Sequence, residues 1–163
     1  MHTAYLLLGS NLGNRHSYLE QAKELIGKHC GTIIQQSSVY ETAAWGVTDQ
    51  PSFYNQVIVL QTTLLPETLM QQLLDIEESM GRKRTIKYGP RTIDIDIQLI
   101  DNLTNNSALL MLPHPYLPER RFSLLPITEV APQFVHPVLH KTITELLNDC
   151  KDRLGVKKVV EKN

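Results

Sequence analysis

Residues 92–97 alternate strictly between polar side chains and isoleucine. Because successive side chains of a strand point to opposite faces, this alternation predicts a strand with one apolar and one polar face. The polar face carries Thr92, Asp94 and Asp96. The apolar face, extended to residue 99, carries Ile93, Ile95, Ile97 and Leu99. The sequence therefore predicts a half-buried strand that presents two carboxylates side by side.

Apolar patterns elsewhere predict further strands and two long helices. Short apolar runs place strands at Thr3–Leu8, Ile33–Tyr40 and Phe53–Gln61. Apolar side chains at helical spacing place helices at Arg15–Cys30 and Pro66–Met80. The order strand, helix, strand, strand, helix, strand indicates an α+β fold of the ferredoxin-like βαββαβ type. We expect an antiparallel sheet with both helices on one face and the other face free.

Local signals support the helix boundaries. Asn14 is suited to cap the first helix, and Pro66 is suited to the first position of the second. Gly31 and Gly81 follow the last apolar positions of these helices, where glycine commonly ends a helix. Both helices are therefore predicted with defined ends.

The C-terminal part of the chain is less regular. It is too rich in proline for a long helix, with prolines at 113, 115, 118, 126, 132 and 137 that keep it in short pieces. Thr142 followed by Glu145 forms a capping box, which predicts a last helix that ends near Lys151. Residues 156–163 are expected to be frayed. We therefore expect a C-terminal extension that ends in a helix.

Composition limits the number of domains and the kinds of partner. A chain of 163 residues with 42% hydrophobic residues predicts a single domain over residues 1–163. Its formal net charge of −1 gives no general attraction for nucleic acid or for anionic membranes. Cys30 and Cys150 are too few and too distant for a disulfide scaffold, which fits a reducing compartment, the cytoplasm. The apolar run Ala4–Leu8 is too short for a signal peptide or a membrane span.

The two carboxylates of the alternating strand suggest a site for a hard cation. Residues two apart on a strand are about 7 Å apart, so Asp94 and Asp96 are held together on one rigid surface. Mg²⁺ binds oxygen ligands and commonly takes one or two protein carboxylates, with water and substrate phosphates at its other positions. Polar residues that alternate along a strand are, however, more often simply its solvent-facing side.

A basic segment precedes this strand. Arg82, Arg84, Lys87 and Arg91 place cationic side chains, including guanidinium groups suited to phosphate, next to the carboxylates. A basic loop alone is as often a solvated surface. Its position beside the aspartates instead favours a polyphosphate site that stabilises charge during phosphoryl or pyrophosphoryl transfer. The unpatterned segment Glu41–Pro51 holds the single tryptophan and is long enough to fold over such a site.

Four further residues have two interpretations each. His114 lies between two prolines and is a candidate for the pocket, although a lone histidine is more often an ordinary surface or core residue. Phe53 and Phe122 are on composition alone better assigned to the core. Glu77 lies one turn beyond Leu73, so its carboxylate faces either water or the pocket.

Eight strings of residues then occur in the order found in one enzyme family. They are Gly9-Ser10-Asn11-Leu12-Gly13, Tyr40-Glu41-Thr42, Asp49-Gln50-Pro51, Phe53-Tyr54-Asn55, Gly81-Arg82-Lys83-Arg84, Gly89-Pro90-Arg91-Thr92-Ile93-Asp94-Ile95-Asp96, Pro113-His114 and Arg120-Arg121-Phe122. With these strings the chain, as far as about Phe134, resembles the 6-hydroxymethyl-7,8-dihydropterin pyrophosphokinases of folate biosynthesis. The resemblance implies transfer of the β,γ-diphosphate of ATP to the pterin hydroxymethyl group with release of AMP.

The resemblance also implies roles for individual residues. The metal ligands would be Asp94 and Asp96, which would hold two Mg²⁺ ions that bridge ATP. The catalytic set would be Arg82, Arg91, Asp94 and Asp96. The ATP-binding set would be Glu77, Arg84, Tyr88, Arg91, His114, Tyr116 and Arg120. The pterin-binding set would be Thr42, Ala43, Trp45, Phe53, Asn55 and Phe122. Asn55 would read the hydrogen-bonding edge of the pterin, and the two phenylalanines would sandwich its ring.

The expected mechanism relies on orientation, metal activation and electrostatics, since no side chain stands out as a general base. We expect the loops Glu41–Pro51 and Arg82–Arg91 to close over bound ATP. The protein is expected to be a monomer or a weak homodimer, with no nucleic acid or membrane partner. Two other functions stay open: a non-enzymatic ferredoxin-like module that binds a ligand or RNA, and a metal-dependent nucleotidyltransferase, which would release pyrophosphate.

Overall fold

The computed structural model describes residues 1–42, 51–81 and 92–159. In chain order the elements are β1 (His2–Ser10), α1 (Arg15–His29), β2 (Thr32–Gln36), β3 (Tyr40–Thr42), β4 (Phe53–Thr62), α2 (Pro66–Ser79), β5 (Asp94–Ile100), β6 (Asn105–Asn106), β7 (Met111–Leu112), a 3-10 turn (Leu117–Glu119), α3 (Arg121–Val130), α4 (Ile143–Asp149) and β8 (Val156–Lys158). Among the described residues, no helix is both long enough and apolar enough to cross a membrane.

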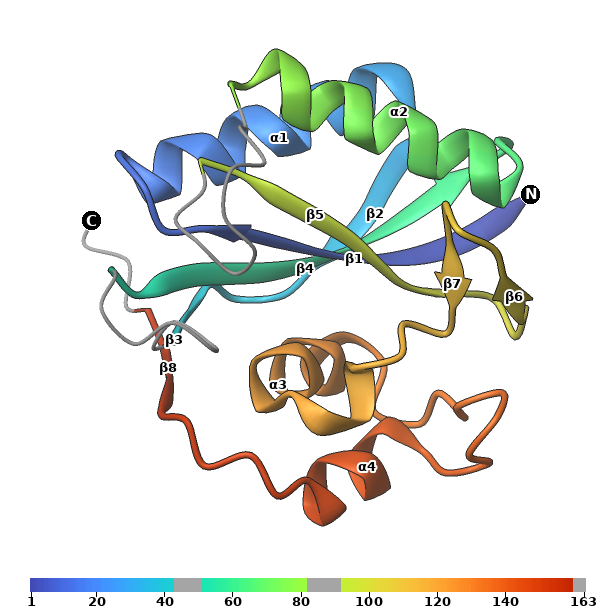
Figure 1. Cartoon of the computed structure of the whole chain (residues 1–163). Helices are drawn as coiled ribbons and strands as arrows, with labels where there is room; N and C mark the ends of the chain where they lie inside the picture. The colour runs from blue at the N-terminus through green and yellow to red at the C-terminus, as the bar shows by residue number, and fades with distance from the viewer. Residues whose placement is uncertain (43–50, 82–91, 160–163) are drawn as a thin grey trace.

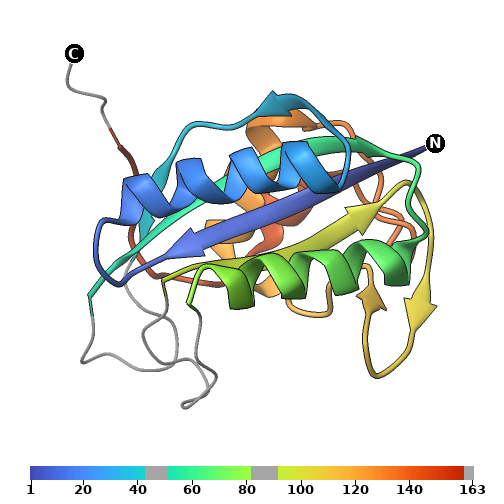
Figure 2. The same cartoon turned by 90° about the horizontal axis from the view of Figure 1, so that it is seen from above.

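The main sheet is antiparallel and has helices on both of its faces. Its strands follow the order β5-β1-β4-β3-β8, and β2 pairs with β4 beside β3. Figure 1 shows α1 and α2 on one side of the sheet and α3 and α4 on the other. Seen from above in Figure 2, α1 and α2 run side by side across the sheet. The mixed α/β class with an antiparallel sheet was therefore predicted correctly.

Two separate apolar cores correspond to the two faces. The larger core packs α1 and α2 against the sheet through fully buried side chains such as Leu6, Leu8 and Ile58. The smaller core packs α3 and α4 against the opposite face, where Leu7 and Val57 are buried. The expectation of a free second face was wrong, because alternate residues of β1 and β4 are apolar on that side too and require a cover.

A β-bulge changes the faces of β5 halfway along the strand. Leu6 pairs with Ile97, but Tyr5 pairs with Leu99, so Gln98 is the extra residue of β5. Beyond the bulge, Leu99 faces α3, while Ile100 joins the core beneath α1 and α2. The prediction that Leu99 shares a face with the isoleucines was therefore wrong, although the faces of residues 93–97 are as expected.

Other boundaries follow or depart from the local signals. The Asn14 side chain accepts from the Ser17 N–H at the start of α1, Pro66 is the first residue of α2, and the capping box of Thr142 is formed. Pro126, in contrast, lies inside α3 and does not end it. The starts of α1, α2 and α4 were predictable because each depends on residues within one helical turn.

Two strand predictions were wrong in detail. The predicted strand Ile33–Tyr40 is broken into β2 and β3. After β2 the Ser37 hydroxyl accepts from the Val57 N–H at 2.9 Å, while the Ser37 N–H donates to the Val57 carbonyl at 2.8 Å. The expected frayed end contains β8, which pairs with β3 through three residues. The Tyr40–Thr42 strand thus has a neighbour on each side, β4 and β8.

Candidate functional site

A row of residues crosses the sheet at one end of its strands. Gly9 of β1 lies directly opposite Asn55 of β4 and directly opposite Asp94 of β5. Tyr40 of β3 extends the row, since it lies opposite Asn55. Residues directly opposite each other in an antiparallel sheet share a face. Asn55, Gly9 and Asp94 therefore stand in line on one face of the sheet.

That face is the one covered by α3. Leu7 lies opposite both Val57 and Asp96, and Leu7 and Val57 belong to the core beneath α3. Asp96 is therefore on the α3 side, and Asp94, two residues away, is there as well. Both side chains are half-buried. The prediction that the two aspartates share a face is confirmed.

The carboxylate pair is suited to magnesium. Among the described residues, no group of three or more His, Cys, Asp or Glu is arranged to hold a metal ion by itself. Two carboxylates on one surface match the habit of Mg²⁺, which leaves its remaining positions to water and phosphate oxygens. The residues present therefore fit a metal that binds together with a polyphosphate.

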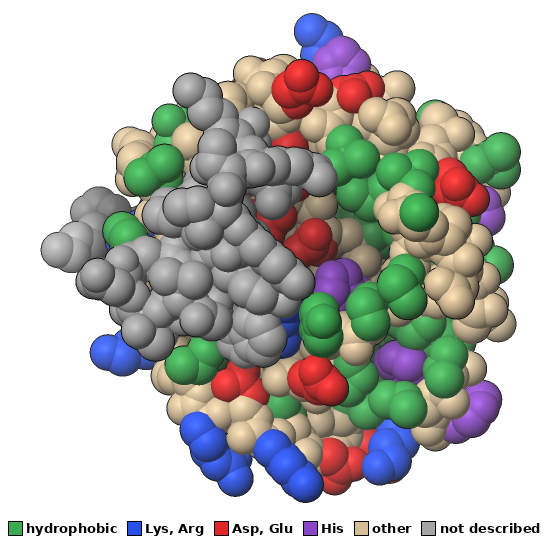
Figure 3. Space-filling view, viewed as in Figure 1, with side chains coloured by type: hydrophobic (Ala, Val, Ile, Leu, Met, Phe, Trp, Pro, Cys, Tyr) green, Lys and Arg blue, Asp and Glu red, His purple; other side chains and the backbone are tan. Residues whose placement is uncertain are grey.

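A cluster of His114, Tyr116, Arg120 and Phe122 lies near the aspartates. The backbone N–H of His114 donates to the Gln98 carbonyl at 2.9 Å, which attaches this segment to β5. The Arg120 guanidinium lies 4.7 Å from the centre of the Tyr116 ring and 5.6 Å from that of Phe122. Figure 3 shows acidic side chains and a histidine close together near the middle of this view, with apolar side chains beside them.

His114 is neutral at physiological pH. Burial and the nearby Arg120 guanidinium lower the pKa of His114 to about 4, against the opposing effect of Asp94. The Nδ1 atom accepts from the backbone N–H of Tyr116 at 3.1 Å. In a neutral ring the proton then resides on Nε2, which is left as a donor. His114 can therefore donate one hydrogen bond toward an anionic ligand without carrying a charge.

Glu77 is buried and does not face water. Its residue is only 1% exposed, and Oε2 accepts from the Ile95 backbone N–H at 2.6 Å. Because β5 is an edge strand, its outward N–H groups need partners from outside the sheet. Glu77 supplies that partner at the residue between Asp94 and Asp96. The Glu77 carboxylate, which comes from α2, thus fixes the backbone that carries both aspartates.

Of the residues predicted for the pterin, the described ones lie on β3, β4 and α3. Thr42 pairs with Phe53, two residues along from the pair formed by Tyr40 and Asn55. The Thr42 hydroxyl is buried and has no hydrogen-bond partner within residues 1–42, 51–81 and 92–159. Asn55 is 4% exposed, so its amide is enclosed by protein. Phe122 packs at the margin of the core beneath α3, on the same side of the sheet as Phe53.

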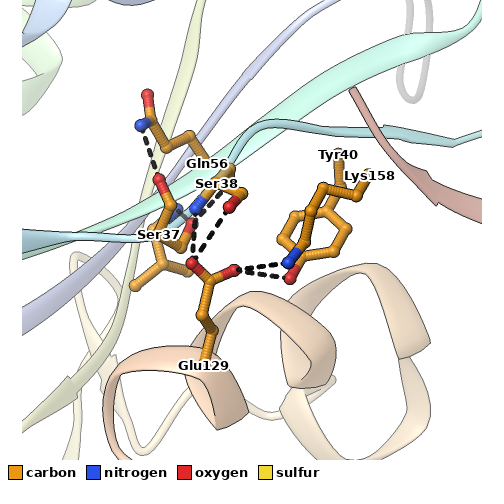
Figure 4. Close-up of polar contacts among 7 residues, drawn as sticks. Ser37, Ser38, Tyr40, Gln56, Glu129 and Lys158 are labelled. Atoms are coloured by element: carbon orange, nitrogen blue, oxygen red, sulfur yellow. Dashed lines mark hydrogen bonds and ion pairs between the residues drawn. The ribbon is translucent and has the colours of Figure 1, made fainter. Parts of the chain in front are cut away.

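Sequence reasoning missed a polar network that joins α3 to the sheet. Figure 4 shows the Glu129 side chain extending from α3 toward the connection between β2 and β3. Its carboxylate accepts from the Tyr40 hydroxyl at 2.6 Å and from the Ser38 N–H at 2.8 Å. Lys158 of β8 lies 3.9 Å from the same carboxylate. No sequence signal marks this contact, because Tyr40 and Glu129 are far apart in the chain.

The network also shifts the pKa values of its members. Partial burial favours a higher pKa for Glu129, but hydrogen bonds from Tyr40 and Ser38, with the charge of Lys158, outweigh it and lower the pKa. Burial and the hydrogen bond to Glu129 raise the pKa of Tyr40. The pair is therefore a carboxylate and a protonated phenol at neutral pH.

Arg15 and Asn11 were also missed. The Arg15 guanidinium donates to the Ser52 carbonyl at 3.0 Å and to Glu41 at 3.1 Å. The Asn11 amide donates to the Pro51 carbonyl at 3.0 Å. Both side chains thus attach the start of α1 and the turn before it to the residues that flank segment 43–50.

Several predicted site residues lie outside the described residues. They are Ala43, Trp45, Arg82, Arg84, Tyr88 and Arg91. The predicted closure of the two loops concerns mostly the same segments. Among the described site residues, Asp94 and Asp96 of β5 lie near His114 and Arg120, and Thr42, Phe53 and Asn55 lie on β3 and β4, with Phe122 beside Arg120.

Comparison with known proteins identifies the family. Residues 5–132 match the model of the 7,8-dihydro-6-hydroxymethylpterin-pyrophosphokinase (HPPK) family. The chain is 41% identical over 145 residues to the 2-amino-4-hydroxy-6-hydroxymethyldihydropteridine pyrophosphokinase of Aquifex aeolicus. This match covers 89% of this chain and 90% of that protein. It is 40% identical over 131 residues to the enzyme of the same name from Bacillus subtilis, covering 80% of this chain and 78% of that one.

Solved structures show the same fold. An HPPK-DHPS protein crystallised with substrates superposes with a TM-score of 0.78 at 18% identity, over 91% of this chain and 43% of that one. An HPPK-DHPS of Plasmodium falciparum superposes with a TM-score of 0.75 at 20% identity, over 91% of this chain and 45% of that one. This chain thus spans less than half of those longer proteins. Its family match, its curated relatives and its fold agree, and the chain belongs to the 7,8-dihydro-6-hydroxymethylpterin-pyrophosphokinase family.

Proposed function

We propose that this protein transfers the β,γ-diphosphate of ATP to the hydroxymethyl group of 6-hydroxymethyl-7,8-dihydropterin and releases AMP, as a step of folate biosynthesis. Membership of the family and the names of its relatives support this reaction. The observation that carries the proposal is the row in which Asn55, Gly9 and Asp94 lie in line on one face. It brings a candidate pterin-reading amide and a candidate metal carboxylate to the same surface.

The nucleotide is assigned to the side of the site that holds the aspartates. Asp94 and Asp96 would hold Mg²⁺, and we propose two ions. When bound, the metal supplies neutralisation of charge on the triphosphate as it is attacked. Arg120 would pair with phosphate oxygens, and His114, neutral at working pH, would donate from Nε2. Glu77 would act by fixing the strand that carries the aspartates.

The pterin is assigned to the opposite side of Gly9. Asn55 would hydrogen-bond to the edge of the pterin, whose donors and acceptors match those of an amide. The hydroxyl of Thr42, which has no hydrogen-bond partner among the described residues, would make a further hydrogen bond to the pterin. Phe53 and Phe122 would stack on the two faces of the ring. This arrangement orients the hydroxymethyl group toward the metal-bound phosphates, so that positioning supplies much of the rate.

The family resemblance supports further binding residues. We propose that the triphosphate and nucleotide are bound by Arg82, Arg84, Tyr88 and Arg91, and that the pterin is bound by Ala43 and Trp45. Arg82 and Arg91, together with Asp94 and Asp96, form the proposed catalytic set. Tyr116, whose ring lies beside Arg120, is proposed for the nucleotide.

The fold and the state of assembly complete the proposal. We assign the sheet to the ferredoxin-like class, with β2 and β3 counted together as one interrupted strand. We further propose that residues 1–163 form one pyrophosphokinase domain, which acts as a monomer or weak homodimer without nucleic acid or membrane partners. Both cysteines are free thiols, which supports a reducing compartment such as the cytoplasm.

One assay tests the reaction. The protein is incubated with ATP and Mg²⁺, with and without 6-hydroxymethyl-7,8-dihydropterin, and AMP and pyrophosphate are quantified. We expect AMP only when the pterin is present. Release of pyrophosphate would indicate a nucleotidyltransferase instead, and failure to bind ATP with Mg²⁺ would favour a non-enzymatic binding module.

Matched variants test the metal site. Asp94→Ala and Asp96→Ala should each lower AMP formation by a factor of about 10³ or more, since each removes a charged metal ligand. Asp75→Ala, which removes an exposed carboxylate from α2, is the control and should retain activity. Full activity of either strand variant would refute the assignment of the metal site.

A further inference from the structure

Gly9 occupies the middle of the row between the two halves of the site. A Cβ atom built on Gly9 would lie 2.9 Å from the Oδ1 atom of Asn55. The same atom would lie 3.6 Å from Cδ1 of Phe53 and 3.9 Å from Cβ of Asp94. Real Cβ atoms essentially never lie closer than 3.0 Å to such an atom, and ordinary van der Waals contact is at 3.4–4 Å. The Asn55 amide is thus the group that a side chain at Gly9 would displace.

The need for glycine here is steric and does not come from backbone conformation. Among the described residues, the glycines with positive φ are Gly13, Gly31 and Gly81. Gly9 is a regular member of β1 and is paired on both sides. An alanine can adopt that backbone without strain. The consequence of a methyl group at this position is therefore decided by what it touches.

Asn55 has little freedom to avoid such a methyl group. Its backbone is held by β1 on one side and by β3 on the other. Its side chain is short and 4% exposed, so relief requires a different rotamer within an enclosed space. A changed rotamer would redirect both the donor and the acceptor of the amide. The Cβ of Asp94, at ordinary contact distance, would not need to move.

We propose that Gly9 is a positioning residue for pterin recognition, which acts by leaving room for the Asn55 amide beside the metal carboxylates. This inference rests on the proposed function, in which Asn55 reads the pterin. Adjacent strands are about 4.8 Å apart, so Asn55 and Asp94 stand on backbones about 10 Å apart. Because Gly9 has no side chain, the Asn55 amide can extend over the backbone of β1 that lies between the two residues.

The test compares two glycine variants. Gly9→Ala is compared with Gly27→Ala, because a Cβ on Gly27 of α1 would meet no atom within 4 Å. KM values for the pterin and for ATP are measured by AMP release, and binding of a non-hydrolysable ATP analogue with Mg²⁺ is measured by calorimetry. For Gly9→Ala we expect the KM for the pterin to rise about tenfold or more while nucleotide affinity changes less than about twofold. Gly27→Ala should leave both values unchanged.

A double-mutant cycle then tests whether Gly9 acts through Asn55. In an Asn55→Ala background the amide is absent, so adding Gly9→Ala should change pterin affinity by less than about twofold. An equal loss in both backgrounds, or an unchanged KM for the pterin in Gly9→Ala alone, would overturn the inference. If Gly9→Ala does not fold but the double variant does, the clash with Asn55 is supported. If neither folds, the methyl group meets something else and the inference is wrong.

The same set separates this inference from the proposed function. Asn55→Ala with normal pterin affinity would refute the role of Asn55 itself. Wild-type protein that forms no AMP with the pterin would refute the reaction. A wild-type enzyme that depends on Asn55 but tolerates Gly9→Ala would overturn only the role of Gly9.

Discussion

The two faces of the sheet differ in how completely their helices cover them. Beneath α1 and α2, side chains such as Leu6 and Leu8 continue the apolar core along β1. On the α3 side, β1 passes from Leu7 to Gly9, and β4 passes from Val57 to Asn55. The apolar part lies under α3 and α4, and the polar end carries the candidate site. The same strands thus contribute only core residues to the face beneath α1 and α2. They contribute both core residues and candidate site residues to the α3 face.

This difference explains why the second face can carry a site without loss of the fold. The larger core supplies most of the apolar burial, so a few polar residues at the end of the other face cost little stability. The candidate site is held instead by individual contacts, such as Glu77 with Ile95 and Glu129 with Tyr40. Substitutions on the two faces should therefore have different signatures.

Leu6→Ala should have the largest effect on stability. Leu6 is fully buried beneath α1 and α2, so we expect a loss of about 2–5 kcal/mol in the free energy of unfolding, measured by denaturant titration. The activity of the molecules that remain folded should change less than about twofold, because Leu6 faces away from the site. A large loss of activity with normal stability would contradict the assignment of the candidate site to the α3 face alone.

Glu77 should show an intermediate effect that reaches both stability and activity. Glu77→Leu leaves the buried Ile95 N–H without its acceptor, which should cost about 1–3 kcal/mol of stability. Because Ile95 lies between the two aspartates, the variant should also require more Mg²⁺ for half-maximal rate. Glu77→Gln keeps an acceptor oxygen and serves as the matched control. If Gln and Leu variants need the same Mg²⁺ concentration as wild type, the positioning role is wrong.

Glu129 should contribute less, because it is partly exposed and solvent weakens its contacts. Glu129→Gln is expected to lower the free energy of unfolding by about 1 kcal/mol. Tyr40→Phe, which removes the hydroxyl group but retains the Glu129 carboxylate, is the variant for comparison. The folded-state pKa of Glu129 lies below its ordinary value of 4.5. Its contribution is therefore complete above that value and is lost as the pH falls through the lower, folded-state pKa. A stability difference between wild type and Glu129→Gln that grows on acidification would contradict this sign.

The titration of His114 is a further prediction and concerns the protein without metal. Its pKa is lowered to about 4, so it should take up a proton only well below the ordinary value of 6.5. Since the unfolded chain binds that proton more readily, the contribution to stability is present above 6.5 and lost as pH falls toward 4. Histidine resonances followed by NMR, with His114→Gln for assignment, measure the midpoint. A midpoint near 6.5 would show that His114 is not enclosed as described.

Local features of the fold could be predicted from the sequence. Apolar spacing identified the long helices, and Asn14, Pro66 and Thr142 marked helix starts because each acts within one turn. Contacts between distant segments were not predictable. The bulge at Gln98 leaves the apolar pattern of β5 looking uninterrupted, and the pairing of β8 with β3 involves a short strand without a strong pattern.

The candidate site shows the same limit. Strict alternation was enough to place Asp94 and Asp96 on one face. The position of Gly9 between Asn55 and Asp94 depends on the register of three strands, which no local pattern contains. Glu129 and Arg15 act on residues far away in the chain, so their roles appear only once the chain is folded.

In the proposed mechanism, one face of β5 presents both carboxylates to a metal-bound triphosphate. Crystals grown with Mn²⁺, a non-hydrolysable ATP analogue and the pterin would locate the metal by its anomalous scattering. We expect peaks at bonding distance, about 2.0–2.2 Å, from carboxylate oxygens of both Asp94 and Asp96, with the pterin on the Asn55 side of Gly9. Metal bound elsewhere, with either aspartate directed away from it, would show that Asp94 and Asp96 are not the metal ligands.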